Sequence, residues 1–247
     1  MMENLIKSNE RNNRFSLFIL GFCGLSIISL FYSILDIYRN IIFNIFEINL
    51  LPNLVNFVNN YSGIVNYTIY ATAFVLIILI LDKTYFEQTF IAFKDKETYK
   101  NGIGYGIVLI LASMLVGLIT NMFIETSVNV NQNAVNNMIL SNPIMSFITV
   151  VIMGPIVEEF TYRYGLFGIL KAKNKVLAYI VTILLFAFIH FEFTSDPKLL
   201  FNEFLNLPSY LVSASVLCIA YDKSDNLAVP IIAHIFNNFI SFVMMFI

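Results

Sequence analysis

The stretch at residues 144–170, IMSFITVVIMGPIVEEFTYRYGLFGIL, decides how the rest of the chain is interpreted. Its length and apolar content are those of a membrane-spanning helix, which needs about 20 predominantly apolar residues. It nevertheless carries three ionisable side chains, Glu158, Glu159 and Arg163. Each such group costs about 2.5–3.5 kcal/mol at the centre of a bilayer, and it persists where it is paired or used. The stretch therefore predicts a buried site inside a membrane helix.

The composition of the whole chain also indicates a membrane protein. Of its 247 residues, 58% are hydrophobic and 12% are charged, and the mean hydropathy is +0.78. Average soluble domains have about 45–50% and about 25%, respectively. This excludes a disordered chain, a nucleic-acid-binding surface and a charge-covered soluble domain. Cys23 and Cys218 lie in apolar runs and are too few for a disulfide framework or a CxxC metal site.

Seven apolar segments predict an all-α fold, a polytopic transmembrane helical bundle of about seven spans (six to eight). They are Phe15–Leu35, Ile64–Leu81, Ile103–Phe123, Ile144–Leu170, Val176–Phe191, Phe204–Ala220 and Leu227–Ile247. The first is longer than the apolar region of a signal peptide and predicts a retained span. Ile41–Val58 is apolar but interrupted by Glu47 and Pro52, which favours an interfacial or re-entrant helix.

Basic residues in the connections predict a cytoplasmic N-terminus. In that orientation, eleven of the fourteen lysines and arginines lie in cytoplasmic segments and two in external ones, while Arg163 lies within a span. Such a bias is typical of cytoplasmic loops. Asp82–Gly102 is expected to be a cytoplasmic loop and Glu125–Pro143 an external one. The chain then divides into a cytoplasmic segment at residues 1–14, N-terminal transmembrane helices and loops at 15–143, and a catalytic core at 144–247.

Helix geometry separates the three ionisable residues of the core. Glu159 and Arg163 are four positions apart, so they share one face and lie within ion-pair reach. Glu158 is turned by about 100° from Glu159 and has no partner on its own helix. An unpaired carboxylate in low dielectric suits a general acid or base. We therefore expect Glu159 and Arg163 to stabilise the packing and Glu158 to take part in chemistry; one purely structural charge network is the alternative.

Both histidines of the chain lie in predicted spans. His190 is near the end of one helix, and His234 precedes Asn238 by four residues on another. Measured from the cytoplasmic charge that flanks each helix, these three residues and Glu158 lie about 14–22 Å deep at 1.5 Å per residue. A shared layer near the middle of the membrane predicts that Glu158, His190, His234 and Asn238 converge around one polar cavity.

This set of side chains fits hydrolysis of a carbonyl compound by activated water. Glu158 would take the proton of the water, and His190 would orient the water or relay its proton. His234 and Asn238 would donate hydrogen bonds to the developing oxyanion. Glu158, His190 and His234 are also a possible zinc-binding set with an open position for water. Because an H-E-x-x-H signature is absent, we favour chemistry without a cofactor and keep zinc as the alternative.

Three motifs in the core resemble those of the CPBP family (CAAX protease and bacteriocin-processing, or Abi), a family of intramembrane proteases. They are Glu158-Glu159-x-x-x-Arg163, Phe186-x-x-x-His190 and His234-x-x-x-Asn238. The resemblance covers about Ile144–Ile247 and implies peptide-bond hydrolysis inside an all-helical bundle. It implies catalytic roles for Glu158, His190, His234 and Asn238, with Glu159, Arg163 and Phe186 completing the motifs. Members of the family are commonly labelled metalloproteases, and its prenyl proteases typically have eight spans.

The expected partners are the lipid bilayer and a peptide or membrane-protein substrate, with no nucleic acid. The abundance of Asn, Ile, Lys and Phe suggests a bacterial chain, hence a multi-pass protein of the plasma membrane. By family resemblance, the expected role is processing of a bacteriocin, pheromone or leader peptide. The rival interpretations are a non-catalytic membrane immunity or scaffold protein of the same fold and a proton-coupled transporter, although the sequence lacks the inverted repeat that many transporters have.

Overall fold

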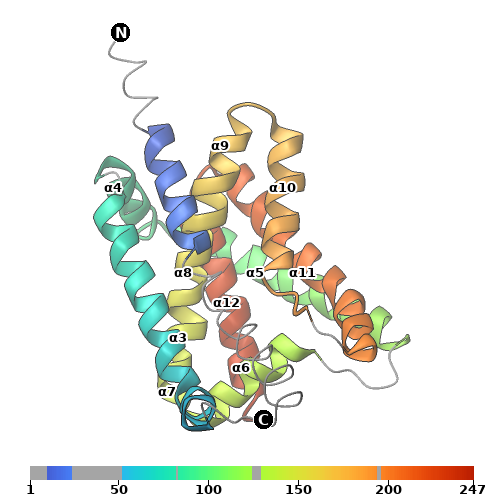
Figure 1. Cartoon of the computed structure of the whole chain (residues 1–247). Helices are drawn as coiled ribbons and strands as arrows, with labels where there is room; N and C mark the ends of the chain where they lie inside the picture. Colours follow the sequence, from blue (N-terminus) through green and yellow to red (C-terminus); the bar gives the residue numbers. More distant parts are fainter. Residues whose placement is uncertain (1–9, 24–51, 82, 124–128, 194–195) are drawn as a thin grey trace.

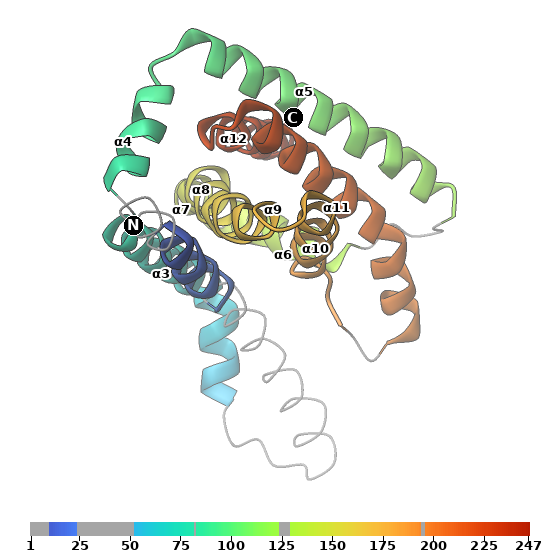
Figure 2. The same cartoon turned by 90° about the horizontal axis from the view of Figure 1, so that it is seen from above.

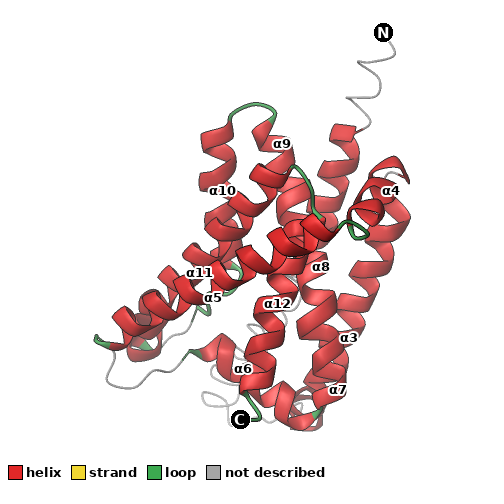
Figure 3. Cartoon of the chain, turned by 180° about the vertical axis from the view of Figure 1, so that it is seen from behind, coloured by secondary structure: helices red, strands yellow, loops and turns green. Residues whose placement is uncertain are grey.

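The computed structural model describes residues 10–23, 52–81, 83–123, 129–193 and 196–247, and every regular element among them is helical (Figures 1 and 3). The elements are a helix at residues 10–23, α3 (Pro52–Ile80), α4 (Lys83–Ala92), α5 (Lys96–Asn121), α6 (Val130–Ser141), α7 (Pro143–Ser146), η2 (Phe147–Met153), α8 (Gly154–Glu159), η3 (Phe160–Phe167), α9 (Gly168–Lys171), α10 (Lys175–Phe188), α11 (Pro197–Ser224) and α12 (Ala228–Met244). The predicted all-α fold is confirmed.

The elements from α7 to α9 form one continuous helix, Pro143–Lys171, which we call the central helix. Two parts of it, η2 and η3, are π-helical. The amide of Gly154 donates to Thr149 O, five residues back, and the amide of Gly168 donates to Arg163 O in the same way. Pro155 follows the first π-helical part and has no amide to donate. Short π-helical stretches are rare and occur frequently at functional sites.

The central helix is enclosed by the other helices when the molecule is seen along its length (Figure 2). The helix at residues 10–23 and α3 lie on one side, α10 and α11 lie on another, and α12 lies on a third. α5 packs along α12 and α11 and forms the outer layer there. This arrangement places the middle of the central helix, with its ionisable residues, inside protein rather than against lipid.

Membrane-spanning length is reached by three of the described helices: Lys96–Thr120, the central helix and α11. The bent pair Asn66–Ile80 and Lys83–Ala92 adds a fourth if it is one span, while α10 and α12 are apolar but shorter. These helices make the chain a multi-pass membrane protein. Part of the predicted span at Phe15–Leu35 and most of Ile41–Val58 lie outside the described residues.

Two segments predicted to be loops contain helices, so those predictions are wrong. Asp82–Gly102 holds α4 and the start of α5, and Glu125–Pro143 holds α6. The polar residues that suggested loops act as helix caps. Asp95 accepts a hydrogen bond from the amide of Glu97, and Asn129 accepts one from the amide of Gln132. Asp and Asn are strongly preferred at this position, because their side chains bond amides that the helix leaves unpaired.

The helix at residues 10–23 packs closely on the central helix because glycines face it. A Cβ on Gly165 would lie 3.1 Å from the carbonyl oxygen of Arg14, and one on Gly168 would collide with Nη1 of Arg14. Small residues let membrane helices approach in this way. The Arg14 guanidinium also donates to Tyr164 O over 2.8 Å. The N-terminal helix is thereby fixed against the second half of the central helix.

Candidate active site

The predicted ion pair of Glu159 and Arg163 is confirmed, and it includes a third residue. Oε1 of Glu159 lies 2.9 Å from Arg163 Nη1, and both side chains have no exposed surface. The same oxygen lies 2.9 Å from Nδ1 of His234 on α12. A carboxylate only accepts hydrogen bonds, so Nδ1 of His234 carries the donated proton. Glu159 therefore fixes the orientation of the imidazole and leaves Nε2 available for another contact.

Glu158 points to the other nitrogen of the same histidine. Its Oε2 lies 3.9 Å from His234 Nε2, and both residues are 7% exposed. Its Oε1 accepts a hydrogen bond from the hydroxyl of Tyr70 on α3 over 3.3 Å. The expectation that Glu158 lacks a partner held only for its own helix, since its neighbours come from α3 and α12. The structure thus brings Glu158 and His234 together.

The sequence places His190 near the end of a helix. In the structure, His190 lies in the turn that follows α10. Its Nδ1 lies 2.9 Å from the carbonyl oxygen of Phe186. A carbonyl accepts, so this nitrogen is the donor and Nε2 of the neutral ring is free, as in His234. His190 interacts electrostatically with Glu158, His234 and Arg163. His190 therefore lies near the same cluster. Its interaction with Glu158 is electrostatic, whereas His234 lies 3.9 Å from Glu158.

Asn238 lies one helical turn beyond His234 on α12. Its Nδ2 donates to the carbonyl oxygen of Val150 in η2 over 2.9 Å, and its Oδ1 accepts from Asn237 over 3.0 Å. These contacts join α12 to the central helix next to the cluster. Its side-chain nitrogen is occupied by Val150, so an interaction with a substrate would use its second N–H group or a rearrangement.

Phe186 packs at the centre of the site. Its ring lies 4.3 Å from Cζ of Arg163 and 5.3 Å from the ring of Tyr162. It also lies 5.0 Å from the ring of His190 and 6.0 Å from that of His234. A cation over an aromatic face is attracted by the ring quadrupole. Phe186 therefore covers the buried guanidinium and separates the two histidines.

The site contains buried polar atoms that lack a hydrogen-bond partner within the described part of the chain. They are Oε2 of Glu159, the hydroxyl of Tyr162, and Nε, Nη1 and Nη2 of Arg163, whose guanidinium is paired with Glu159 as an ion and covered by the ring of Phe186. Buried groups of this kind are usually paired with ordered water.

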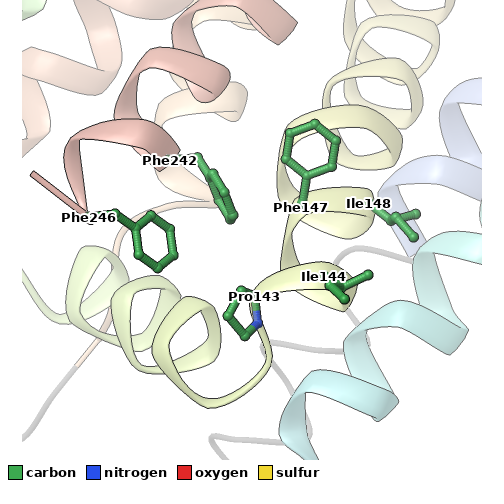
Figure 4. A pocket seen from close by; sticks show the side chains of 6 residues that line it. All are labelled: Pro143, Ile144, Phe147, Ile148, Phe242 and Phe246. Atoms are coloured by element: carbon green, nitrogen blue, oxygen red, sulfur yellow. The ribbon is translucent and has the colours of Figure 1, made fainter.

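The two main cavities lie beside the cluster rather than in it. The larger, about 510 Å³, lies between the start of the central helix and the end of α12 and has an entirely apolar lining (Figure 4). Its lining residues are Pro143, Ile144, Phe147, Ile148, Phe242 and Phe246. The smaller, about 230 Å³, includes Ile156 and Phe160 of the central helix and Ile231 of α12. Neither of these two cavities is lined by Glu158, His190 or His234.

The described residues do not form the predicted zinc-binding set. No group of three His, Cys, Asp or Glu side chains among them is placed to hold one metal ion. The residues of the site therefore do not fit a three-ligand metal centre in this arrangement. The bond of His234 Nδ1 to Glu159 does not argue against a metal, since a metal-ligating histidine usually donates its other ring N–H in this way.

Three contributors to the site were not predicted from the sequence. Tyr70 bonds Glu158, Val150 bonds Asn238, and Tyr210 stacks on His190. A tyrosine in an apolar span is ordinary in membrane proteins, so the sequence around Tyr70 and Tyr210 carries no signal. Val150 contributes only a backbone oxygen, which any residue would supply.

The chain is similar to one known protein family and to two known proteins. Residues 140–240 match the family model described as type II CAAX prenyl endopeptidase Rce1-like. UPF0177 protein YvdC of Lactococcus lactis subsp. lactis (strain IL1403) is 31% identical over 88 residues, 36% of this chain and 33% of that protein. Membrane-embedded CAAX protease MroQ of Staphylococcus aureus (strain USA300) is 30% identical over 151 residues, 58% of this chain and 56% of that protein.

The aligned part spans about a third of the length of YvdC and about half of the length of MroQ. The match to the family model includes all seven motif residues, from Glu158 to Asn238. No solved structure matches the chain.

Proposed function

Because this chain belongs, through residues 140–240, to the CAAX protease (CPBP) family of intramembrane proteases, we propose that it is a membrane endopeptidase. Its substrate would be a membrane-associated peptide or protein, and the reaction would be hydrolysis of a peptide bond by activated water. The observation that supports this most is the pair of proton acceptors, Oε2 of Glu158 and Nε2 of His234, 3.9 Å apart in the bundle interior.

This pair is suited to activating water. A water molecule within hydrogen-bond distance of both acceptors would direct one proton to each and one lone pair to a carbonyl carbon. Glu158 would take the proton of the attacking water and later deliver it to the leaving amine. Tyr70, which donates to the other oxygen of Glu158, would hold the carboxylate in place during both steps.

The remaining side chains would orient and stabilise the reacting groups. His190 presents a free Nε2 and would relay or hold a proton of the water. His234 would take the second proton of the water at Nε2, from the hydroxyl of the tetrahedral adduct, and would then donate a hydrogen bond to the oxyanion, because Glu159 already occupies Nδ1. This proton would leave with the amine product. Asn238 would add an amide donor beside His234, a type of interaction worth about 2.7–4 kcal/mol in transition-state stabilisation.

We propose that this chemistry needs no metal ion, because the described residues lack a three-ligand set. The purified protein is expected to contain less than one equivalent of zinc and to keep its activity after treatment with a chelator. Metal analysis and a cleavage assay with and without the chelator measure this. Stoichiometric zinc together with loss of activity on chelation would contradict the proposal and favour zinc held by Glu158, His190 and His234.

The proposed substrate class is a secreted peptide precursor, such as a bacteriocin, a pheromone or a released leader peptide. The apolar cavity beside the site supports a substrate with apolar residues, since it lies between the two helices that carry Glu158 and His234. The Staphylococcus aureus relative is named as a membrane-embedded CAAX protease. We take a bacterial plasma membrane to be the location of the reaction.

Replacing Glu158 by glutamine tests the function. Cells with the gene, without it, and with Glu158→Gln would be compared by mass spectrometry of their secreted peptides. Glu158→Gln keeps the shape and removes the base, so its peptides should match those of cells without the gene, with normal protein levels. The matched control is Glu97→Gln in α5, an exposed glutamate that pairs with Lys100. Wild-type peptides in the Glu158→Gln cells would refute catalysis and favour a scaffold or immunity role.

A further inference from the structure

The orientation of His190 cannot come from a helix, because the residue lies in the turn after α10. Its amide bonds Ala187 O over 3.2 Å, outside the regular helical pattern. The ring is held at Nδ1 by its bond to Phe186 O over 2.9 Å. Contacts with neighbouring side chains limit how far the ring can move away from that position.

Two aromatic rings supply those contacts. The ring of Tyr210 on α11 lies 5.0 Å from the ring of His190 at an interplanar angle of 20°, an offset stack. The ring of Phe186 lies 5.0 Å away at 43°. Aromatic pairs prefer these separations. The ring of His190 thus contacts Phe186 of α10, the helix that precedes it, and Tyr210 of α11.

Tyr210 is itself held by its hydroxyl group. Nδ2 of Asn129 lies 3.0 Å from that hydroxyl and Nδ2 of Asn131 lies 3.2 Å from it. Asn129 also caps α6 through its bond with the amide of Gln132. Both asparagines belong to the first residues of α6 and its cap. The hydroxyl of Tyr210 therefore has defined partners at a helix end, and its ring has a defined place.

We propose that Tyr210 is a positioning residue that fixes the imidazole of His190 for the reaction. It acts through ring stacking, and Asn129 and Asn131 hold it in place. The inference rests on the proposed function, since it gives Tyr210 a role in the same site. It predicts that loss of the Tyr210 ring changes the state of His190 and leaves that of His234, which Glu159 holds independently.

The chain contains two histidines, which makes the test direct. Protein labelled with ¹⁵N only in histidine, in detergent micelles, gives two imidazole spectra, and His190→Gln assigns them. In the wild type, both rings are expected to carry the proton on Nδ1. In Tyr210→Leu, His190 should lose the ring-current shift of its protons and show a mixture of tautomers. The spectrum of His234 should not change.

Tyr99→Leu, at an exposed tyrosine in α5, is the matched control and should change neither histidine. Tyr210→Phe keeps the ring and removes the hydroxyl, so it should shift His190 in the same direction by a smaller amount. An unchanged His190 spectrum in Tyr210→Leu would overturn the proposal. If Tyr210→Leu does not fold, the same result in Tyr210→Phe would overturn it.

This outcome is independent of the test of the proposed function. Continued cleavage by Glu158→Gln would remove the catalytic role of the site and leave the spectra of the Tyr210 variants as predicted. An unaffected His190 in those variants would remove only the role of Tyr210.

Discussion

The central helix and α5 have similar lengths and opposite surroundings. Within an 18-residue apolar stretch of each helix, the mean hydropathy is 2.3 and 17% is buried in Lys96–Thr120, whereas the mean hydropathy is 1.6 and 56% is buried in the central helix. The more apolar helix is therefore the more exposed one. In a bilayer the surrounding solvent is itself apolar, so polar and ionisable side chains face the protein interior. Of these two helices, the less apolar one is the one that carries the site.

The largest difference in stability is expected between replacing Arg163 in the central helix and replacing Lys100 in α5. Arg163→Ala leaves the carboxylate of Glu159 buried without its cation, which should cost about 3–5 kcal/mol and lower the yield of folded protein. Lys100→Ala in α5 removes an exposed ion pair with Glu97, and such pairs contribute little. Thermal unfolding in detergent would measure both variants.

A double variant sharpens this prediction. Glu159→Leu with Arg163→Met replaces both charges by apolar groups, so it should be more stable than Arg163→Ala alone, because no uncompensated charge remains. Equal unfolding temperatures for Arg163→Ala and Lys100→Ala would contradict the difference drawn between the two helices.

A smaller effect is expected at glycines of the same two helices. Gly165→Ala would put a Cβ 3.0 Å from Cβ of Phe18 and force the N-terminal helix away, at a cost of about 1–3 kcal/mol. Gly104→Ala in α5 meets nothing within 4 Å and should be neutral or slightly stabilising, since alanine favours helices. Unfolding temperatures of the two variants test this, and a similar loss in both would show that close packing does not distinguish the helices.

The features that could be predicted from the sequence are those that depend on residues close together in the chain. The bundle follows from runs of apolar residues, and the pairing of Glu159 with Arg163 follows from their spacing of four on one helix. The convergence of Glu158, His190 and His234 was predicted from depth along three helices, which limits where each side chain lies but not which way it points.

Other features depend on contacts between residues far apart, and the sequence did not predict them. The bond of Glu159 to His234 joins residues 75 positions apart. Nothing local indicates that one carboxylate serves both an arginine and a histidine, or that Tyr70 reaches Glu158. The helices α4 and α6 were also missed, because asparagine and aspartate that cap a helix are the same residues that form loops.

The shared oxygen of Glu159 has a consequence for anyone who redesigns this protein. Oε1 contacts both Arg163 on its own helix and His234 on α12. The same atom therefore stabilises the buried ion pair and orients the proposed catalytic histidine. A library that varies these positions one at a time would sample mainly unstable proteins. Combinations in which Glu159, Arg163 and His234 change together are the ones in which a different acid–base pair has a chance to be accommodated.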